Sequence, residues 1–116
     1  MTIQEFYIAI GGDFEDVKHR LMTEKLITRF VMKFPGDPSM QQLRDALAQD
    51  DKEVAFRAVH TLKGVAANLS FTQLQKAASD LTEQLRPKTE AADPILYNKV
   101  EETYRQTIDA IKQIEA

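Results

Sequence analysis

The apolar residues between positions 51 and 69 recur at helical spacing, and they constrain the fold more than any other feature of the sequence. At about 100° per residue, seven of them fall within roughly 60° of Leu62. These are Ala55, Ala58, Val59, Leu62, Val65, Ala66 and Leu69. A stripe of this width and length indicates a helix with one face buried against a core.

The opposite face of the same helix carries the residues that invite a functional reading. His60 lies about 160° from Leu62, so its side chain is expected to point outward. Glu53, Arg57, Gly64 and Ala67 share its face, and Lys63 flanks it one turn on. The imidazole is therefore expected to stand in solvent beside a cation.

Gly64 is unusual because it stands inside this helix, where glycine costs about 1 kcal/mol relative to alanine. The apolar stripe continues to Leu69, so the glycine does not mark the end of the helix. Its missing Cβ leaves room next to the imidazole. A phosphoryl group or the backbone of a partner can approach the ring closely there.

The rest of the chain also favours helices, because apolar residues follow i, i+3 and i+4 spacing and no segment alternates with period two. Helix-capping residues support several starts: Thr2, Asp13, Thr23, Ser39, Asp50, Ser70 and Asp93 before Pro94. We predict long helices at 23–34, 51–69, 71–86 and 94–114, and short ones at 3–10, 13–21 and 40–48. Because the connections are short, neighbouring helices should be antiparallel. The predicted fold is all-α: one domain, 1–116, with an antiparallel up-down four-helix bundle of the long helices and short additional N-terminal helices.

Composition excludes several classes of function. The net charge is −3, the pI is near 5.4, and basic residues are interleaved with acidic ones, so nucleic acid is not expected as a partner. The absence of cysteine excludes disulfides, thiolate metal sites and cysteine catalysis, and two histidines are thin material for a metal site. Neither a signal peptide nor a membrane-length apolar run is present. We expect a soluble cytoplasmic protein, and the initial Met1 suggests a free-standing domain.

The run His60-x-Leu62-Lys63-Gly64-x-Ala66-x-x-Leu69-Ser70 resembles the signature of histidine-containing phosphotransfer (HPt) domains. The signature of that family ends in glycine, where this chain has Ser70. HPt domains carry phosphoryl groups between receiver domains in two-component phosphorelays, and their motif lies on the second helix of an antiparallel four-helix bundle. The resemblance therefore implies that His60 is a phosphoacceptor.

The chemistry of these residue types agrees with that role. An imidazole has an ordinary pKa near 6.5, so at neutral pH an exposed ring is mostly uncharged and nucleophilic. Lys63 is a mobile cation that can reach phosphoryl oxygens, whereas Gly64 and Ala67 keep the surface shallow. The residues leave open which ring nitrogen reacts, and the resemblance implies Nε2.

Further site residues follow from the resemblance and from the predicted helix faces. HPt domains often have a glutamine where Thr82 stands, near the imidazole, and some have a basic residue where Arg86 stands. Their N-terminal helices help to dock the receiver domain, which makes Ile8 and Ile10 candidate docking residues. The alternative is that these two side chains only close one end of the core. The predicted surface around His60 adds two more, Phe56 and Arg57.

The chain has neither a phosphate-cradling glycine-rich loop nor an acidic triad for Mg²⁺, so it should not use ATP or act as an enzyme. No cofactor or metal is expected, because Mg²⁺ and the acceptor aspartate would belong to the partner. The expected partners are response-regulator receiver domains, with a hybrid sensor kinase as a further candidate. The expected function is a phosphocarrier that accepts from a receiver aspartyl phosphate and passes the group to another receiver aspartate.

Two other hypotheses use the same residues. In the first, the chain is a helical docking or scaffold module that binds receiver domains without transferring a phosphoryl group. In the second, it is the dimerisation and phosphoacceptor helix pair of a sensor kinase, in which two helices dimerise into four. Because this chain supplies four long helices itself, we expect a monomer. His19 has no companion signature and is interpreted as a solvated residue.

Overall fold

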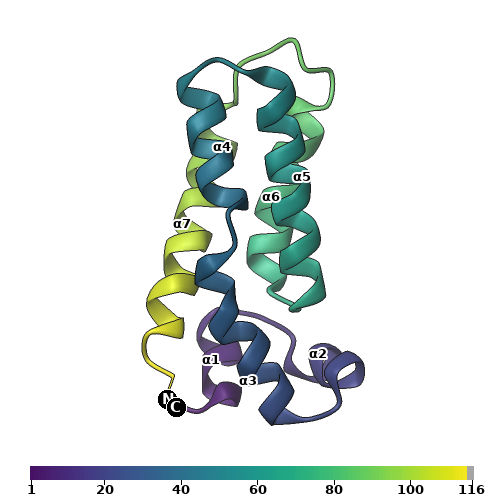
Figure 1. The fold of residues 1–116 in the computed structure, drawn as a ribbon, viewed down its shortest axis with the longest axis vertical. Coiled ribbons are helices and arrows are strands. Elements are labelled where there is room, and N and C mark those ends of the chain that lie inside the picture. Colours follow the sequence, from purple (N-terminus) through teal and green to yellow (C-terminus); the bar gives the residue numbers. More distant parts are fainter. Residues whose placement is uncertain (115–116) are drawn as a thin grey trace.

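The computed structural model describes residues 1–114, which form helices and no strand, as predicted. The α-helices are α1 (Ile3–Ala9), α2 (Phe14–Leu21), α3 (Glu24–Lys33), α4 (Ser39–Ala48), α5 (Lys52–Asn68), α6 (Thr72–Leu85) and α7 (Pro94–Ile111), and a 3-10 turn, η1 (Phe34–Gly36), lies between α3 and α4. Figure 1 shows α4–α7 side by side along the 42 Å length of the molecule, with α1–α3 gathered at one end. None of the described helices is both long and apolar enough to cross a membrane.

The four-helix bundle consists of α4, α5, α6 and α7. Helix α5 packs between α4 and α6, and α6 packs in turn against α7. Arg44 of α4 joins the first helix of the bundle to the last, because its Nη2 and Nε atoms lie 2.8 and 2.9 Å from Glu101 Oε1 on α7. Its guanidinium also lies 5.4 Å from the centroid of the Tyr104 ring.

One prediction about the bundle was wrong. Segment 23–34 was expected to be its first helix and segment 40–48 a short addition, but α4 packs on α5 while α3 packs on α1 and α2. The physical reason is the break at η1, where Pro35 and Pro38 prevent one continuous helix. Helices α3 and α4 therefore follow one another along the molecule, and it is α4 that packs along α5.

An aromatic cluster anchors the N-terminal helices to the bundle. The rings of Phe6, Tyr7, Phe34 and Phe71 lie 5.2–5.9 Å apart, centroid to centroid. The buried hydroxyl of Tyr7 donates a hydrogen bond of 2.7 Å to the carbonyl of Leu69, at the end of α5, and burial raises the pKa of this phenol. Helix α1 therefore packs directly against the connection between α5 and α6.

Helix α5 ends in a left-handed turn at Ser70, whose φ is 56°. The amide of Ser70 donates to Ala67 O and that of Phe71 to Ala66 O, at 3.1 and 2.9 Å, which is the Schellman pattern. Glycine usually takes this position because an L side chain makes the left-handed region costly. The departure of Ser70 from the motif thus falls on the one residue with a conformational reason to be glycine.

Helix α2 supplies the partners that this serine needs. The hydroxyl of Ser70 donates to Asp16 Oδ2 at 2.7 Å and accepts from the guanidinium of Arg20. The same guanidinium donates to the carbonyls of Ala67 and Asn68 at 3.1 and 3.2 Å. The Ser70 hydrogen bond, followed by Arg20, lowers the pKa of Asp16. We call Asp16, Arg20 and Ser70 the α2 clamp.

The predicted caps at Thr2, Asp13, Thr23 and Asp93 are confirmed, each by a side-chain hydrogen bond to the backbone. Three others were wrong. Helix α5 is capped by Asp51, helix α6 begins after Phe71, and helix α4 begins after Pro38. At two of these connections the predicted cap, Asp50 or Ser70, instead ends the preceding helix with a positive φ. The following helix therefore starts one residue later.

Candidate functional site

His60 lies in the middle of α5, and its side chain is exposed, as the wheel predicts. The imidazole makes no hydrogen bond to any other described residue. It stacks instead on Phe56, one turn earlier, with ring centroids 5.8 Å apart and planes 27° from parallel. Stacking can orient the ring while leaving both of its nitrogens available to a partner.

Phe56 is half-buried and joins the imidazole to two cations. The guanidinium carbon of Arg86 lies 5.4 Å from the centroid of the Phe56 ring, and Lys88 Nζ lies 4.9 Å from it. Arg86 ends α6, and Lys88 belongs to the connection 86–93 between α6 and α7. Phe56 was predicted as a candidate docking residue, and its ring is partly covered by these side chains.

Glu83 on α6 is the carboxylate of this site. Arg86 binds it through two atoms, with Nε at 2.9 Å from Oε2 and Nη2 at 2.8 Å from Oε1. These hydrogen bonds are the main cause that lowers the pKa of Glu83, and the charges of Lys63 and His60 lower it further. Glu83 therefore lies within electrostatic reach of both the imidazole and the motif lysine.

The side of His60 that faces Gly64 is open. A methyl group built on Gly64 would meet no atom within 4 Å, apart from its own helix backbone, and the glycine has an ordinary helical conformation. Ala67, one further turn on, is half-buried and small. No contact within the described residues therefore requires a glycine at this position.

Two predicted site residues lie in the core instead. Thr82 is 0% exposed, and its hydroxyl donates to the carbonyl of Ala78 at 2.6 Å, so it does not face solvent beside His60. It lies four residues after Ala78 and three before Leu85, which are both buried, and therefore on the inner face of α6. Ile10 is 3% exposed and packs in the core, whereas Ile8 is 80% exposed on α1. Arg57 is exposed on α5, three residues before His60.

The structure also brings together features that the sequence reading missed. Glu83 and Lys88 reach the site through the antiparallel pairing of α5 with α6, and residues near Pro87 show no periodicity that could have identified them.

A groove of about 570 Å³ lies between α2, α3 and the last turns of α5. It is lined by Arg20, Leu21, Phe30, Lys33, Phe34, Gly36, Asp37, Val65, Asn68 and Leu69. Phe30, one of these residues, is 44% exposed.

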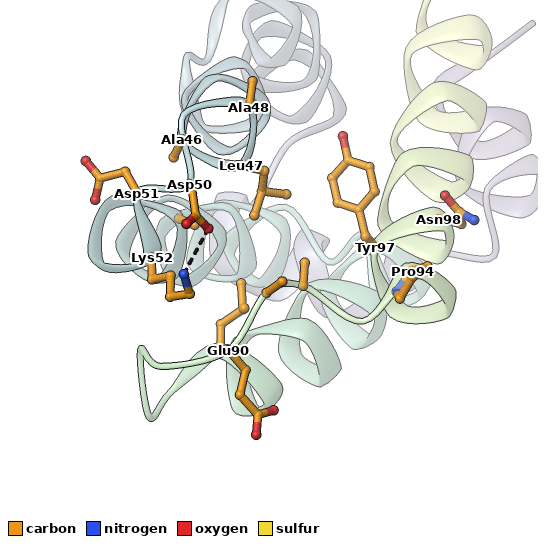
Figure 2. A pocket seen from close by; sticks show the side chains of 14 residues that line it. Ala46, Leu47, Ala48, Asp50, Asp51, Lys52, Glu90, Pro94, Tyr97 and Asn98 are labelled. Atoms are coloured by element: carbon orange, nitrogen blue, oxygen red, sulfur yellow. Dashed lines mark hydrogen bonds and ion pairs between the residues drawn. The ribbon is translucent and has the colours of Figure 1, made fainter.

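A second cavity, of about 440 Å³, opens at the other end of the bundle (Figure 2). Leu47 of α4 and Tyr97 of α7 line it, and Asp50 at its mouth pairs with Lys52 at 2.9 Å. Asp51 and Glu90 add further negative charge, which disfavours a phosphate. No three His, Asp or Glu side chains gather as a metal site would require anywhere in residues 1–114. The exposed imidazole therefore remains the candidate site.

Comparison with known proteins identifies a family. A family model described as "Hpt domain" matches residues 26–114, which include the bundle, the motif around His60 and the connection that carries Lys88. No curated protein and no solved structure matches the chain. The match spans more than half of the chain. The protein therefore belongs to the Hpt domain family, whose members are phosphocarriers rather than catalytic enzymes.

Proposed function

We propose that this protein carries a phosphoryl group on His60, accepting it from the aspartyl phosphate of one receiver domain and passing it to the aspartate of another. The observation that carries the proposal is the exposed imidazole, which is oriented by Phe56 and has no hydrogen-bonding partner among the described residues. Gly64 leaves open space beside it, and membership of the Hpt family supplies the reaction class.

The transfer needs positioning and charge stabilisation more than covalent chemistry from the protein. The lone pair of Nε2 attacks phosphorus, the bond from phosphorus to the aspartate oxygen breaks, and the carboxylate leaves with that electron pair. The other ring nitrogen keeps its proton, so the ring gains positive charge. Glu83, whose carboxylate feels the charge of His60, is placed to stabilise it. Attack by the next receiver aspartate reverses the step.

Lys63 would contact the phosphoryl oxygens during this transfer. Its side chain is half-buried and forms no ion pair within the described part of the chain, so its ammonium is available. The open surface at Gly64 lets the phosphoryl group and the partner approach the ring. We expect Mg²⁺ to be bound by the receiver, where it would neutralise oxygens of the same group.

We further propose that the receiver domain docks along the groove between α2, α3 and α5. The groove is lined by Val65 and Asn68 of α5, which follow His60 by about one and a half and two turns on the same helix, so it lies near the site. Phe30, which is 44% exposed, lines the groove together with two cations, Arg20 and Lys33, and one carboxylate, Asp37. An apolar partner surface with acidic edges would fit it. The docking roles of Ile8, Phe56 and Arg57 stay predictions.

The experiment is phosphoryl transfer from a phosphorylated receiver domain of the same organism, read by intact mass at neutral pH. The wild type and His19→Gln should each gain one acid-labile phosphate, and His60→Gln should gain none. If no receiver of a panel phosphorylates the wild type while binding persists in all three proteins, the carrier function is wrong. The protein would then be a docking module.

A second pair of variants tests the docking surface. Phe30→Glu should slow transfer from the receiver about tenfold or more, because it buries a charge in the apolar contact. Ile95→Glu is the control, since Ile95 is 79% exposed at the start of α7, on another helix. Equal rates for the two variants would exclude the groove as the docking site.

A further inference from the structure

The connection between α6 and α7 brings a second lysine close to the phosphoryl site. We propose that Lys88 is a phosphoryl-binding cation that approaches His60 from the side opposite Lys63, and that Arg86 positions Phe56 and does not bind the phosphoryl group. This inference rests on the proposed carrier function of His60. It assigns a role to a residue for which neither the motif nor its spacing predicts one.

The geometry places the two lysines on either side of the imidazole. Along α5, Phe56 precedes His60 by one turn and Lys63 follows it by one turn, which is about 6 and 4.5 Å along the helix axis. Lys88 Nζ lies 4.9 Å from the centroid of the Phe56 ring, and that ring stacks on His60. The stem of a lysine is flexible, so rotation of the Lys88 side chain past the Phe56 ring can bring its ammonium towards a phosphoryl group on the imidazole of His60.

The ion pairs decide which cation is available. Arg86 is held by two hydrogen bonds to Glu83, and leaving that carboxylate would cost both. Lys88 forms neither a hydrogen bond from its ammonium nor an ion pair within residues 1–114, so its contact with the Phe56 ring is readily exchanged. A phosphoryl group brings close to two negative charges, and the unpaired Lys63 and Lys88 can meet them without disturbing Glu83.

The backbone of Lys88 gives an independent argument. Its φ is 61°, in the left-handed region, and its amide donates to Leu85 O at 2.9 Å as it closes the end of α6. Glycine or asparagine is usual at such a position. Lysine there carries a conformational cost. We infer that the placement of its ammonium at Phe56, beside His60, compensates for that cost. The turn also fixes the Cα of Lys88 while its ammonium stays free.

The test measures the ionisation of the phosphoryl group itself. His60 is phosphorylated with phosphoramidate, a small donor that needs no docking, and the phosphohistidine is titrated by ³¹P NMR. A nearby cation favours the dianion, so its removal should raise the phosphoryl pKa. We expect Lys63→Ala and Lys88→Gly each to raise it by about 0.3–0.7 of a pH unit, and the shift should shrink at high salt.

The variants separate charge from folding. Lys88→Gly removes the cation and relieves the left-handed backbone, so its effect cannot come from a weakened fold. Lys88→Arg should keep the titration of the wild type. Lys99→Ala is the control, because Lys99 is 61% exposed on α7 and only loosely paired with Glu102, at 3.7 Å.

The outcomes are distinct from those of the proposed function. If His60 takes the phosphoryl group and Lys63→Ala shifts the titration while Lys88→Gly does not, the inference about Lys88 is wrong and the carrier function stands. A shift that persists in Lys88→Arg would also contradict it, since the charge is kept. If the wild type takes no more phosphate than His60→Gln from either phosphoramidate or receivers, both proposals fail together.

Discussion

Gly64 lowers the stability of α5, and we expect its benefit to be the access that it gives a partner to His60. Because an added methyl group meets nothing within 4 Å, Gly64→Ala should stabilise the fold by about 0.5–1 kcal/mol. The same methyl group narrows the approach to His60, so phosphoryl transfer should fall about tenfold to a hundredfold.

Urea denaturation and transfer kinetics on the same preparation check both halves of this prediction. A loss of stability would mean that the glycine has a structural role within the bundle. Unchanged transfer would mean that clearance beside the imidazole is not limiting. The opposite signs of the two effects are what distinguish a functional glycine from a structural one.

Tyr7 gives a prediction about a single buried hydrogen bond. Tyr7→Phe should lower the free energy of unfolding by about 1–2 kcal/mol, because the carbonyl of Leu69 loses its buried donor. Thermal or urea unfolding measures this directly. Ile8→Ala is the matched control on the same helix, since Ile8 is 80% exposed, and it should change stability by less than about 0.5 kcal/mol. Equal effects for the two variants would contradict the role of the phenol.

At the level of single residues, the sequence predicted which side chains are exposed and which are buried wherever this depends on the periodicity of a single helix. His60 and Gly64 face solvent because α5 alone sets their direction. The prediction that Thr82 lies near the imidazole was wrong because it came from the resemblance, and the exposure of Thr82 depends on how α6 packs on its neighbours. Lys88 could not have been found, because its position depends on a turn after Pro87 and on the antiparallel pairing of two helices.

Among the elements, α5 depends on α2 for its last turn. Ser70→Gly relieves about 1–2 kcal/mol of left-handed strain but removes the hydroxyl that binds Asp16 and Arg20. Ser70→Ala keeps the strain and also loses the hydroxyl. We therefore expect Ser70→Ala to be clearly less stable than Ser70→Gly in urea denaturation. The reverse order would show that the left-handed conformation at position 70 carries no cost for an L side chain.

The α2 clamp should also make stability depend on acid. Folding lowers the pKa of Asp16, so its contribution is fully present above the ordinary value of 3.8 and is lost as the pH falls through the lowered pKa. Asp16→Asn should lack this part of the acid dependence. Urea midpoints measured from about pH 7 down to about pH 2 compare the two proteins, with Asp109→Asn as a control on α7. Identical slopes below pH 3.8 for the wild type and Asp16→Asn would contradict the prediction.

The order of helices could be predicted from apolar spacing, but their partners could not. Segments 23–34 and 40–48 carry similar apolar faces, and the sequence alone does not say which one α5 meets. The turn at Pro35 decides it, by directing α3 towards α1 and α2. The caps failed for a related reason, because a residue between two close helices can either begin one or end the other.

For the whole molecule, one chain closes its own bundle, with Arg44 on α4 joined to Glu101 on α7. The backbone at Gln113 accepts a hydrogen bond from the N-terminus, which brings the two ends of the described chain together. We therefore predict a monomer of 13.2 kDa, measured by light scattering after size exclusion. A dimer that persists on dilution would instead favour the sensor-kinase helix pair.

The left-handed turn at Ser70 also limits the order in which this sequence can change. With glycine at position 70, the left-handed turn would carry no strain, and the end of α5 would need neither Asp16 nor the hydrogen bond from Arg20 to a hydroxyl. With serine there, loss of either Asp16 or Arg20 leaves a residue in the left-handed conformation without one of the partners of its hydroxyl. A change of Ser70 to glycine would therefore have to come before either loss. Serine at position 70 thereby makes α2, which lies outside the motif, part of what closes the end of the motif helix.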